Sequence, residues 1–508
     1  MLVRPSSDDL RTIAFSLGTI FHIAGVAGVV PLLWAAFGRE WAPLSSFALM
    51  IGVFLIGGSL LQRHPPASKT LEWSHGMVVV AVTWITVPLI GSIPLAMSGH
   101  FGDLLDAYFD AMSGLTTTGL SLLQDLDHLA PSLNFWRHLL HFLGGQGIII
   151  AALSLFAGGA GLTLYYGEAR DEKILPSVTS TARFIWGVAL VHLVFGVAAL
   201  ALTAWLGLGF TPGRSLFHGL MIFFAGFDTG GFAPQSTSLG YYHSALFEAV
   251  TAVLMVAGAM SFGLHFALWR APGRRRRGEP ARRSTLWSLE TRSIVATFGI
   301  TLVLTFIGLA ALGIHDSVLG MARQGVFHVL SAHTGTGFAT IGSAELATWG
   351  GLAFGGMAIA MALGGMASST AGGVKALRVG LTVRTVRDQM REVLLPERAL
   401  MSRSYRQGGR RRELTPKVSQ AVMTVSLLYV ALFLLGAGVG LAYGYPLEAA
   451  LFESVSAGAN VGLSVGLTDP SMPVLLQVVY LLQMWLGRLE FAAAFVLVGF
   501  LWAWWRGR

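Results

Sequence analysis

The chain repeats one short pattern four times, as FDAMSGLTTTGLS (residues 109–121), MIFFAGFDTGGFA (221–233), FHVLSAHTGTGFA (327–339) and FESVSAGANVGLS (452–464). Each copy ends in a glycine, then Leu or Phe, then Ser or Ala, and these glycines are Gly119, Gly231, Gly337 and Gly462. Each copy is too short to cross a membrane and lies between longer apolar blocks. An internal repeat of this kind predicts one structural unit that is built four times.

In three of the copies, a Phe lies ten residues before the glycine, and the residue after this Phe is Asp110, His328 or Glu453. In the second copy the matching pair, Phe217 and His218, lies fourteen residues before its glycine. This spacing predicts a four-residue extension in the second unit.

The composition is typical of a membrane protein. Of 508 residues, 54% are hydrophobic and only 12% are charged, whereas a soluble protein has roughly 25% charged residues. The blocks 78–94, 185–209, 294–313 and 418–442 are each about long enough to cross a hydrocarbon core of ~30 Å. Because backbone polar groups must be paired internally in lipid, these blocks are predicted to be helices. The chain has no cysteine, which excludes disulfides and thiolate metal sites.

The 63 glycines admit two interpretations. Glycine lets helices pack closely, and it also allows non-helical backbone at membrane depth where that backbone lines a cavity. A single Gly-x-Ser would favour packing. Four copies, each between two spans, favour a half-helix followed by a return loop, and four return loops can meet on one axis.

The return loops have the chemistry of an alkali-ion path. Backbone carbonyls can replace the hydration shell of a cation, and glycine permits the backbone angles that point successive carbonyls at an axis. Thr and Ser hydroxyls add neutral oxygen ligands, which suit hard ions. Each half-helix points its C-terminal end, with its partial negative charge, toward the axis. The candidate ion ligands are Thr117, Thr118, Thr229, Gly230, Thr336, Asn460 and Val461.

These loops resemble the four pore loops of the TrkH/TrkG/KtrB family of potassium transporters, which is related to the plant HKT proteins. The resemblance continues outside the loops and covers nearly the whole chain. It includes HGMVVVAVTWITVPLIGSIPL (from His75), FWRHLLHFLGGQGIII (from Phe135), SFGLHFALW (261–269), GGMASSTAGGVKALR (364–378) and LGRLE (486–490).

The resemblance implies an all-α polytopic membrane protein in which four span–pore helix–span (M1–P–M2) units surround a pseudo-fourfold pore. Two extra N-terminal spans make the chain more similar to TrkH than to KtrB. The predicted boundaries are 1–70 for the extra spans and 71–165, 180–270, 287–395 and 413–508 for the four units. The family also implies a homodimer with one pore per subunit.

The selectivity filter is carried over from the family residue by residue. Its positions are Thr117, Thr118, Gly119, Thr229, Gly230, Gly231, Thr336, Gly337, Val461 and Gly462. In HKT proteins, Ser at the first filter glycine accompanies sodium transport, so four glycines here imply that potassium is the transported ion. Asp228 and His333 flank the filter, where they either tune ion access or lie in water at the mouth.

The third unit contains a glycine-rich interruption that either kinks a helix or forms a flexible loop at membrane depth. The resemblance makes residues 364–374 a loop that closes the pore beneath the filter. The candidate gating residues are Gly364, Gly365, Ser368, Ser369, Thr370, Gly372, Gly373, Lys375 and Arg488.

Two of these gating candidates are charged. We expect the Lys375 side chain to extend to the cytoplasm. Arg488 lies in the last apolar block, where a charge needs a partner or the pore. It is therefore either a positive barrier near the loop or a structural ion pair, and Glu490 lies off its helix face.

Basic residues are concentrated between the predicted units. The segment 270–292 holds eight Arg and two acids, and 378–417 holds eleven Lys or Arg and four acids. Basic loops stay in the cytoplasm, so we place linkers 164–183, 270–292 and 384–417 there, in a bacterial inner (plasma) membrane. Because these linkers flank spans and carry few aromatics, topology explains them better than nucleic-acid binding. They are also the predicted docking region for a cytosolic TrkA-like nucleotide-binding ring, the regulatory partner that the resemblance implies.

Two transport mechanisms remain open from the sequence. The ion either flows passively through a gated pore, or it is coupled to a proton or to sodium, which would need a titratable group at the midplane. An enzyme is not expected, because the chain has no HExxH, GxSxG or GxxxxGK[ST] motif and no paired carboxylates inside the spans. No organic cofactor is expected, and potassium is the transported ion. The N-terminus, MLVRPSSDDL, lacks a cleavage site, so the first apolar block is predicted to be retained.

Overall fold

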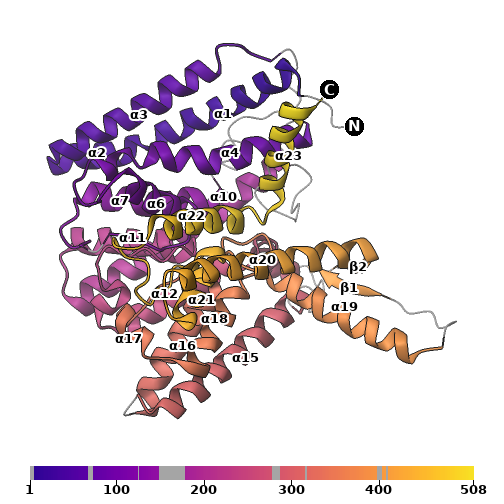
Figure 1. Ribbon diagram of the computed structural model, residues 1–508. Helices are drawn as coiled ribbons and strands as arrows, with labels where there is room; N and C mark the ends of the chain where they lie inside the picture. The colour runs from indigo at the N-terminus through magenta and orange to yellow at the C-terminus, as the bar shows by residue number, and fades with distance from the viewer. Residues whose placement is uncertain are drawn as a thin grey trace.

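The computed structural model describes residues 5–66, 72–123, 125–147, 178–276, 287–314, 317–396, 403–407 and 410–507. The fold there is helical except for one antiparallel hairpin of β1 (Ser404–Gln407) and β2 (Arg410–Glu413), which the sequence did not predict. In Figure 1, α1 begins and α23 ends toward the same side of the molecule as the hairpin. Parts of all three predicted linkers, including 164–177, 277–286 and 397–402, and the predicted end of unit one lie outside the described residues.

Six described helices, some of them joined pairs, are long and apolar enough to cross a membrane. They are α1 (Ser7–Ala27) with α2 (Val29–Gly38), α3 (Trp41–Leu61), α4 (Trp73–Gly91) with α5 (Ile93–Ala96), α10 (Val178–Leu202) with η1 (Thr203–Gly207), α15 (Leu289–Leu312) and α20 (Pro416–Ala442). The four apolar blocks predicted from the sequence lie almost entirely within α4 with α5, α10 with η1, α15 and α20, so their helical prediction is confirmed. Two candidate spans precede α4.

Four shorter helices each pack against the long helix before them. They are α6 (Leu104–Leu115), α11 (Pro212–Phe227), α16 (Val318–Thr334) and α21 (Leu447–Gly458). The Asp103 and Ser317 side chains accept backbone N–H groups at the starts of α6 and α16, and Pro occupies the first position of α11. All four helices are buried toward their C-terminal ends, where the chain turns sharply.

The helix that follows each turn is short or bent. These helices are α7 (Pro131–Gln146), α12 (Ala245–Ala259) with α13 (Phe262–Arg276), α18 (Gly351–Ala362) with α19 (Ala376–Leu394), and α22 (Val474–Arg488) with α23 (Ala492–Arg506). The α12–α13 and α22–α23 pairs bend by 103° and 108°. Units two and four therefore each end in a bent pair of helices rather than in one straight helix. Glu490 and Phe491 adopt positive φ values of 47° and 69° at the second bend, which ends α22 just after Arg488.

Helix contacts between neighbouring units run in a closed circuit. Helix α7 contacts α11, α12 contacts α16, α18 contacts α21, and α22 returns to contact α6. The N-terminal helices lie outside this circuit, with α1 against α4 and α2 against α7 (Figure 1). The four turns are thereby brought to the middle of the molecule.

Candidate functional site: a ring of four turns

The four turns have the same backbone hydrogen bonds. After each short helix ends, the N–H of Thr118, Gly230, Thr336 or Val461 donates to the carbonyl five residues earlier, over 2.7 to 2.9 Å. The acceptors are Ser113, Ala225, Ser331 and Ser456. This common spacing makes Ile222 the counterpart of Asp110, so α11 carries no insertion near its turn. Helix α11 has 16 residues and α6 has 12, and the difference adds one turn at the start of α11.

The backbone of each turn alternates in conformation. The residue just before each donor has a positive φ: Thr117 56°, Thr229 51°, Gly335 73° and Asn460 55°. Two residues later, the four repeated glycines have φ values between 77° and 92°. A β-branched residue such as Thr rarely adopts positive φ, and such outliers cluster at functional sites. Positive φ is the kind of backbone conformation that pointing successive carbonyls at an axis requires.

The turns form a closed ring. A Cβ atom added to Gly119 would lie 2.3 Å from Gly230 O, and one added to Gly231 would lie 2.1 Å from Thr336 O. A Cβ atom added to Gly337 would lie 1.8 Å from Val461 O, and one added to Gly462 would lie 2.2 Å from Thr118 O. Each glycine therefore faces a carbonyl oxygen of the next turn, and the fourth turn closes on the first. The structure brings together all ten residues that the sequence placed in the filter.

A cavity of about 450 Å³ lies on one side of this ring. Its lining includes all four repeated glycines together with residues such as Ser121, Arg137 and Asp469. In the adjoining loop, the exposed Asp125 carboxylate accepts a hydrogen bond from His128 at 2.9 Å. This hydrogen bond lowers the pKa of Asp125 and raises the pKa of His128. Asp125 therefore stays ionised in more acidic solution than an isolated carboxylate does.

The opposite side of the ring is covered by the glycine-rich segment of unit three. Residues 363–375, between α18 and α19, are non-helical, and all but Leu363 are buried. Every predicted gating residue except Arg488 lies in this segment, which we call the inner loop. A Cβ atom added at Gly372 would lie 2.2 Å from Ala459 O, so the inner loop presses directly against the end of α21.

Hydrogen bonds join the inner loop to the second unit. Thr370 Oγ1 lies 2.9 Å from Gly258 O and 3.1 Å from Phe227 O, and it accepts from Thr229 Oγ1 at 3.2 Å. Backbone bonds from Met366 N to Ala259 O and from Phe262 N to Ser368 O bridge the α12–α13 bend. The loop thus supplies partners for backbone groups that a continuous helix would pair internally.

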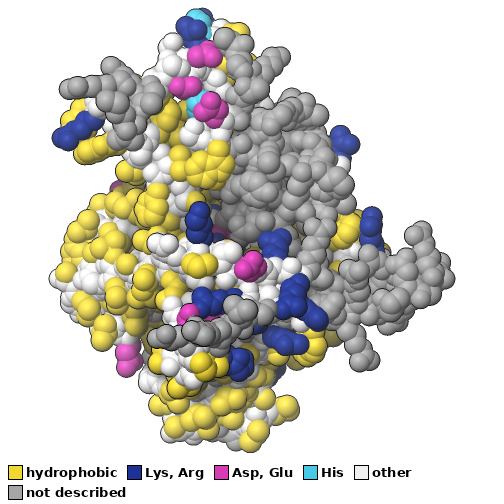
Figure 2. Space-filling view, turned by 90° about the vertical axis from the view of Figure 1, so that its right-hand side faces the viewer, with side chains coloured by type: hydrophobic (Ala, Val, Ile, Leu, Met, Phe, Trp, Pro, Cys, Tyr) yellow, Lys and Arg dark blue, Asp and Glu magenta, His cyan; other side chains and the backbone are white. Residues whose placement is uncertain are grey.

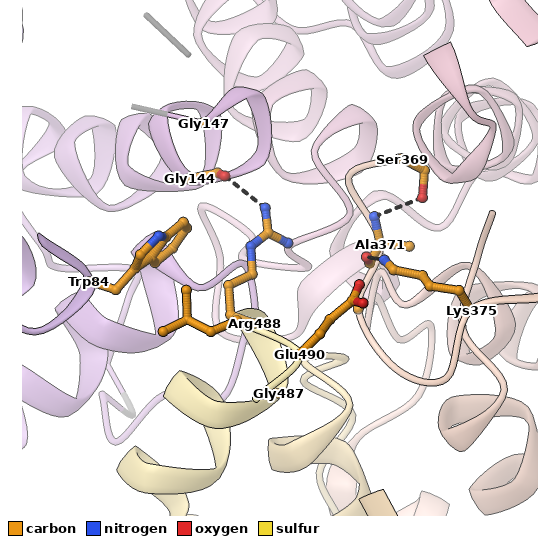
Figure 3. A pocket seen from close by; sticks show the side chains of 11 residues that line it. Trp84, Gly144, Gly147, Ser369, Ala371, Lys375, Gly487, Arg488 and Glu490 are labelled. Carbon is orange, nitrogen blue, oxygen red and sulfur yellow. Dashed lines mark hydrogen bonds between the residues drawn. The ribbon is translucent and has the colours of Figure 1, made fainter. Parts of the chain in front are cut away.

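Arg488 connects the inner loop to the first unit. Its NH1 donates to Thr117 Oγ1 at 2.9 Å and to Thr370 O at 2.7 Å, and its NH2 donates to Gly144 O at 2.7 Å. Figure 3 shows the guanidinium extending from the end of α22 between Trp84 and the inner loop. A positive charge therefore lies immediately beneath the ring.

The structure corrects two sequence-based expectations about charged groups. Lys375 does not extend to the cytoplasm: its side chain is buried and its Nζ donates to Ala371 O within the inner loop. Asp228 and His333 do not lie in water at the mouth, because both are buried at the C-terminal ends of α11 and α16. Asp228 accepts from Gln146 Nε2 at 2.5 Å, and His333 Nε2 lies 2.8 Å from Thr297 Oγ1.

Glu490 has a partner other than Arg488. It pairs with Arg378 in the first turn of α19, as the sequence allowed when it placed Glu490 off the face of Arg488. The bend between α22 and α23 is therefore tied to the helix that leaves the inner loop.

Comparisons with known proteins agree with this architecture. The chain matches the TrkH family model, described as "Cation transport protein", over residues 45–499. It is 29% identical to an uncharacterized cation transporter of Methanocaldococcus jannaschii, with 98% of this chain and 97% of that protein covered. It is 28% identical to the Trk system potassium uptake protein TrkH of Halomonas elongata, with 98% of this chain and 100% of that protein covered. The crystal structure of the potassium transporter TrkH from Vibrio parahaemolyticus has the same fold, with a TM-score of 0.80, 24% identity and coverage of 96% and 98%.

Proposed function

Since the chain belongs to the TrkH family of cation transport proteins, we propose that it takes up potassium through a gated pore whose selectivity filter is the ring of four turns. The main support for this proposal is that each of the four glycines lies against a carbonyl oxygen of the next turn, and that the fourth turn lies against the first. A ring of carbonyl oxygens can replace the water around an alkali ion, and four units of the M1–P–M2 type would surround it. The potassium assignment is supported by relatives that are named potassium uptake proteins, among them TrkH of Halomonas elongata.

The inner loop and Arg488 are the proposed gate. Both lie across the ion path on the side of the ring opposite the large cavity, and they contact the first, second and fourth turns. The partly buried Arg488 guanidinium repels a cation, so the path is closed while this arrangement persists. Opening requires the inner loop to leave its hydrogen bonds with the second unit.

We also propose the family's assembly for this chain, namely a homodimer regulated by a cytosolic TrkA-like nucleotide-binding ring. Support for the ring comes from the basic segments around 270–292 and 384–417. Figure 2 shows Lys and Arg side chains gathered on the face that carries the hairpin end of the molecule. In this arrangement α19 connects a cytoplasmic docking surface to the inner loop, and through the Arg378–Glu490 pair to α22 and α23.

The proposed filter is tested by rubidium uptake into proteoliposomes, with sodium as the competitor, for the wild type and Gly119→Ser. The expected result in the wild type is uptake that resists sodium. In the variant the added Cβ would lie 2.3 Å from Gly230 O, so total uptake should fall, and sodium should strongly inhibit the uptake that remains. Wild-type uptake that sodium inhibits as strongly as in the variant would contradict the filter assignment. Repeating the wild-type measurement with and without a pH gradient separates passive flow from coupling to protons.

Thr370→Val tests the gate, because valine keeps the shape of threonine and removes the hydroxyl that holds the inner loop to unit two. Each lost hydrogen bond destabilises the closed state by on the order of 1 kcal/mol. We therefore expect a several-fold increase in rubidium flux in the absence of any partner protein. Thr348→Val is the matched control, since the Thr348 hydroxyl bonds only within its own turn, to Glu345 O. Flux that is equal in wild type and Thr370→Val would argue against the loop as the gate.

A further inference from the structure

The outer ends of three turns are held by a polar side chain of their own pore helix. Asp110 accepts from Ser121 Oγ at 2.5 Å in the first unit. Glu453 accepts from Ser464 Oγ at 2.5 Å and from Val465 N at 2.9 Å in the fourth. These acceptors are the polar residues that follow Phe in the repeated pattern, and both are fully buried.

The third unit uses a histidine in the same way. His328 Nε2 accepts from Thr340 N at 3.3 Å, and His328 is also fully buried. In units one, three and four, a side chain of the pore helix is therefore hydrogen-bonded to the segment that follows the turn.

The second unit lacks this link. Its counterpart residue is Ile222, which has no polar side-chain atom, and the residue matched to it by sequence, His218, instead contacts Tyr242 OH at 2.8 Å. The segment after the second turn instead makes its hydrogen bonds with side chains of the first unit. Asn134 Nδ2 donates to Pro234 O at 3.0 Å, and His138 Nε2 lies 3.1 Å from Phe232 O.

Arg137 completes the same face of α7. It forms a two-point ion pair with Asp110, with Nε 2.7 Å from Oδ2 and NH2 3.0 Å from Oδ1. Its NH2 also donates to Ser121 Oγ at 3.0 Å, and the guanidinium lies 4.1 Å from the centre of the Phe232 ring. Because Arg137 and Asp110 are both fully buried, neither can leave this arrangement without a large desolvation penalty.

We propose that Asn134, Arg137 and His138 form a brace, a set of positioning residues that fixes the outer ends of the first two turns relative to one another and thereby sets the preference among alkali cations. The proposal rests on the ring being the selectivity filter. Sodium is smaller than potassium, so the ring must contract to coordinate it. A brace that holds two neighbouring turns from behind opposes that contraction, while leaving the ring open to the larger ion.

The brace makes a prediction that a purely structural role does not. Loosening it should change the discrimination between ions and leave the maximal uptake rate nearly unchanged. Ser121→Ala is the mildest test, because the residue is partly exposed in the cavity and loses its bonds to Asp110 and Arg137 together with one local bond from Leu123 N. Ser343→Ala is its matched control, since Ser343 lines the same cavity.

His138 allows a second, independent test. Leucine removes the group that faces Phe232 O, whereas glutamine keeps an N–H donor of similar reach. The brace therefore predicts a defect in His138→Leu that His138→Gln largely rescues. His138→Gln also serves as the readout if His138→Leu does not fold.

The measurement is rubidium uptake into proteoliposomes at increasing sodium, which gives the sodium concentration for half inhibition. We expect this concentration to fall about five- to tenfold in Ser121→Ala and His138→Leu, with saturated uptake within about twofold of wild type. Sodium inhibition that matches wild type in both variants would overturn the brace. If the wild type takes up no rubidium, the proposed function itself fails, so the two failures are distinct.

Discussion

Gly337→Ala is expected to abolish most potassium uptake. The Cβ atom of alanine would lie 1.8 Å from Val461 O, less than any real contact allows, and Gly337 has φ of +86°. The left-handed conformation alone costs roughly 1–2 kcal/mol for a residue with a Cβ, and the overlap forces the third and fourth turns apart. Because the carbonyl oxygens of the third and fourth turns are among those proposed to coordinate the ion, rubidium uptake should fall at least tenfold.

Gly342→Ala is the control for this change. Gly342 lies five residues further along the same loop, has an ordinary φ of −70°, and has no atom within 4 Å of an added Cβ. Its uptake should equal that of the wild type. Retention of full uptake by Gly337→Ala would show that ions do not pass between these turns.

Arg488→Gln is expected to raise cation flux. Two positive charges about 8 Å apart repel by roughly 2 kcal/mol at an effective dielectric constant of about 20, and the Arg488 guanidinium lies against the ring at Thr117. Glutamine removes this repulsion, and it cannot reproduce the three hydrogen bonds that tie Thr117, Thr370 and Gly144 together. Rubidium flux without any regulatory partner should therefore rise more than tenfold.

Arg488→Lys separates the two contributions of Arg488. Lysine keeps the positive charge and loses the fixed fork of donors, so its flux should lie between those of the wild type and the glutamine variant. Arg506→Gln is a control that removes an arginine from the end of α23, where its guanidinium lies against Trp502 and Trp505. Flux in Arg488→Gln at or below the wild-type value would exclude a barrier role for this residue.

The repeated pattern predicted the convergence of the turns because glycine has few reasons to recur at a fixed place between apolar blocks. The long helices were equally predictable, since lipid leaves an apolar block of this length no other structure. The bends after Ala259 and Arg488 were not predictable. Both depend on contacts made far along the chain, namely the bonds that Ala259 and Phe262 make with the inner loop and the ion pair between Glu490 and Arg378.

The positions of the charged residues show where the sequence is informative and where it is not. Hydropathy identified Arg488 as unusual but could not place it, because its partners belong to the first turn, the inner loop and α7. Lys375 was predicted to reach the cytoplasm from its position after the loop, yet the loop folds back and offers it Ala371 O. Arg137 was overlooked within SLNFWRHLLHF, although the Asp110 that pairs with it was part of the repeated pattern.

The second unit illustrates a failure with a physical cause. Matching Phe217 and His218 to the other Phe-polar pairs took for granted that every unit contains such a pair. Hydrogen bonds at the turns instead align Ile222 with Asp110, and the missing acceptor is compensated by donors from α7. A link between units cannot be found by comparing one repeat with another.

The central claim is that the four turns enclose a single path on which carbonyl oxygens replace the water of an alkali ion. Anomalous diffraction from crystals soaked in rubidium tests it most directly. The account predicts a rubidium peak inside the ring, within coordination distance of the carbonyl oxygens of Thr118, Gly230, Thr336 and Val461. Rubidium peaks elsewhere in the molecule, with none inside the ring, would contradict it.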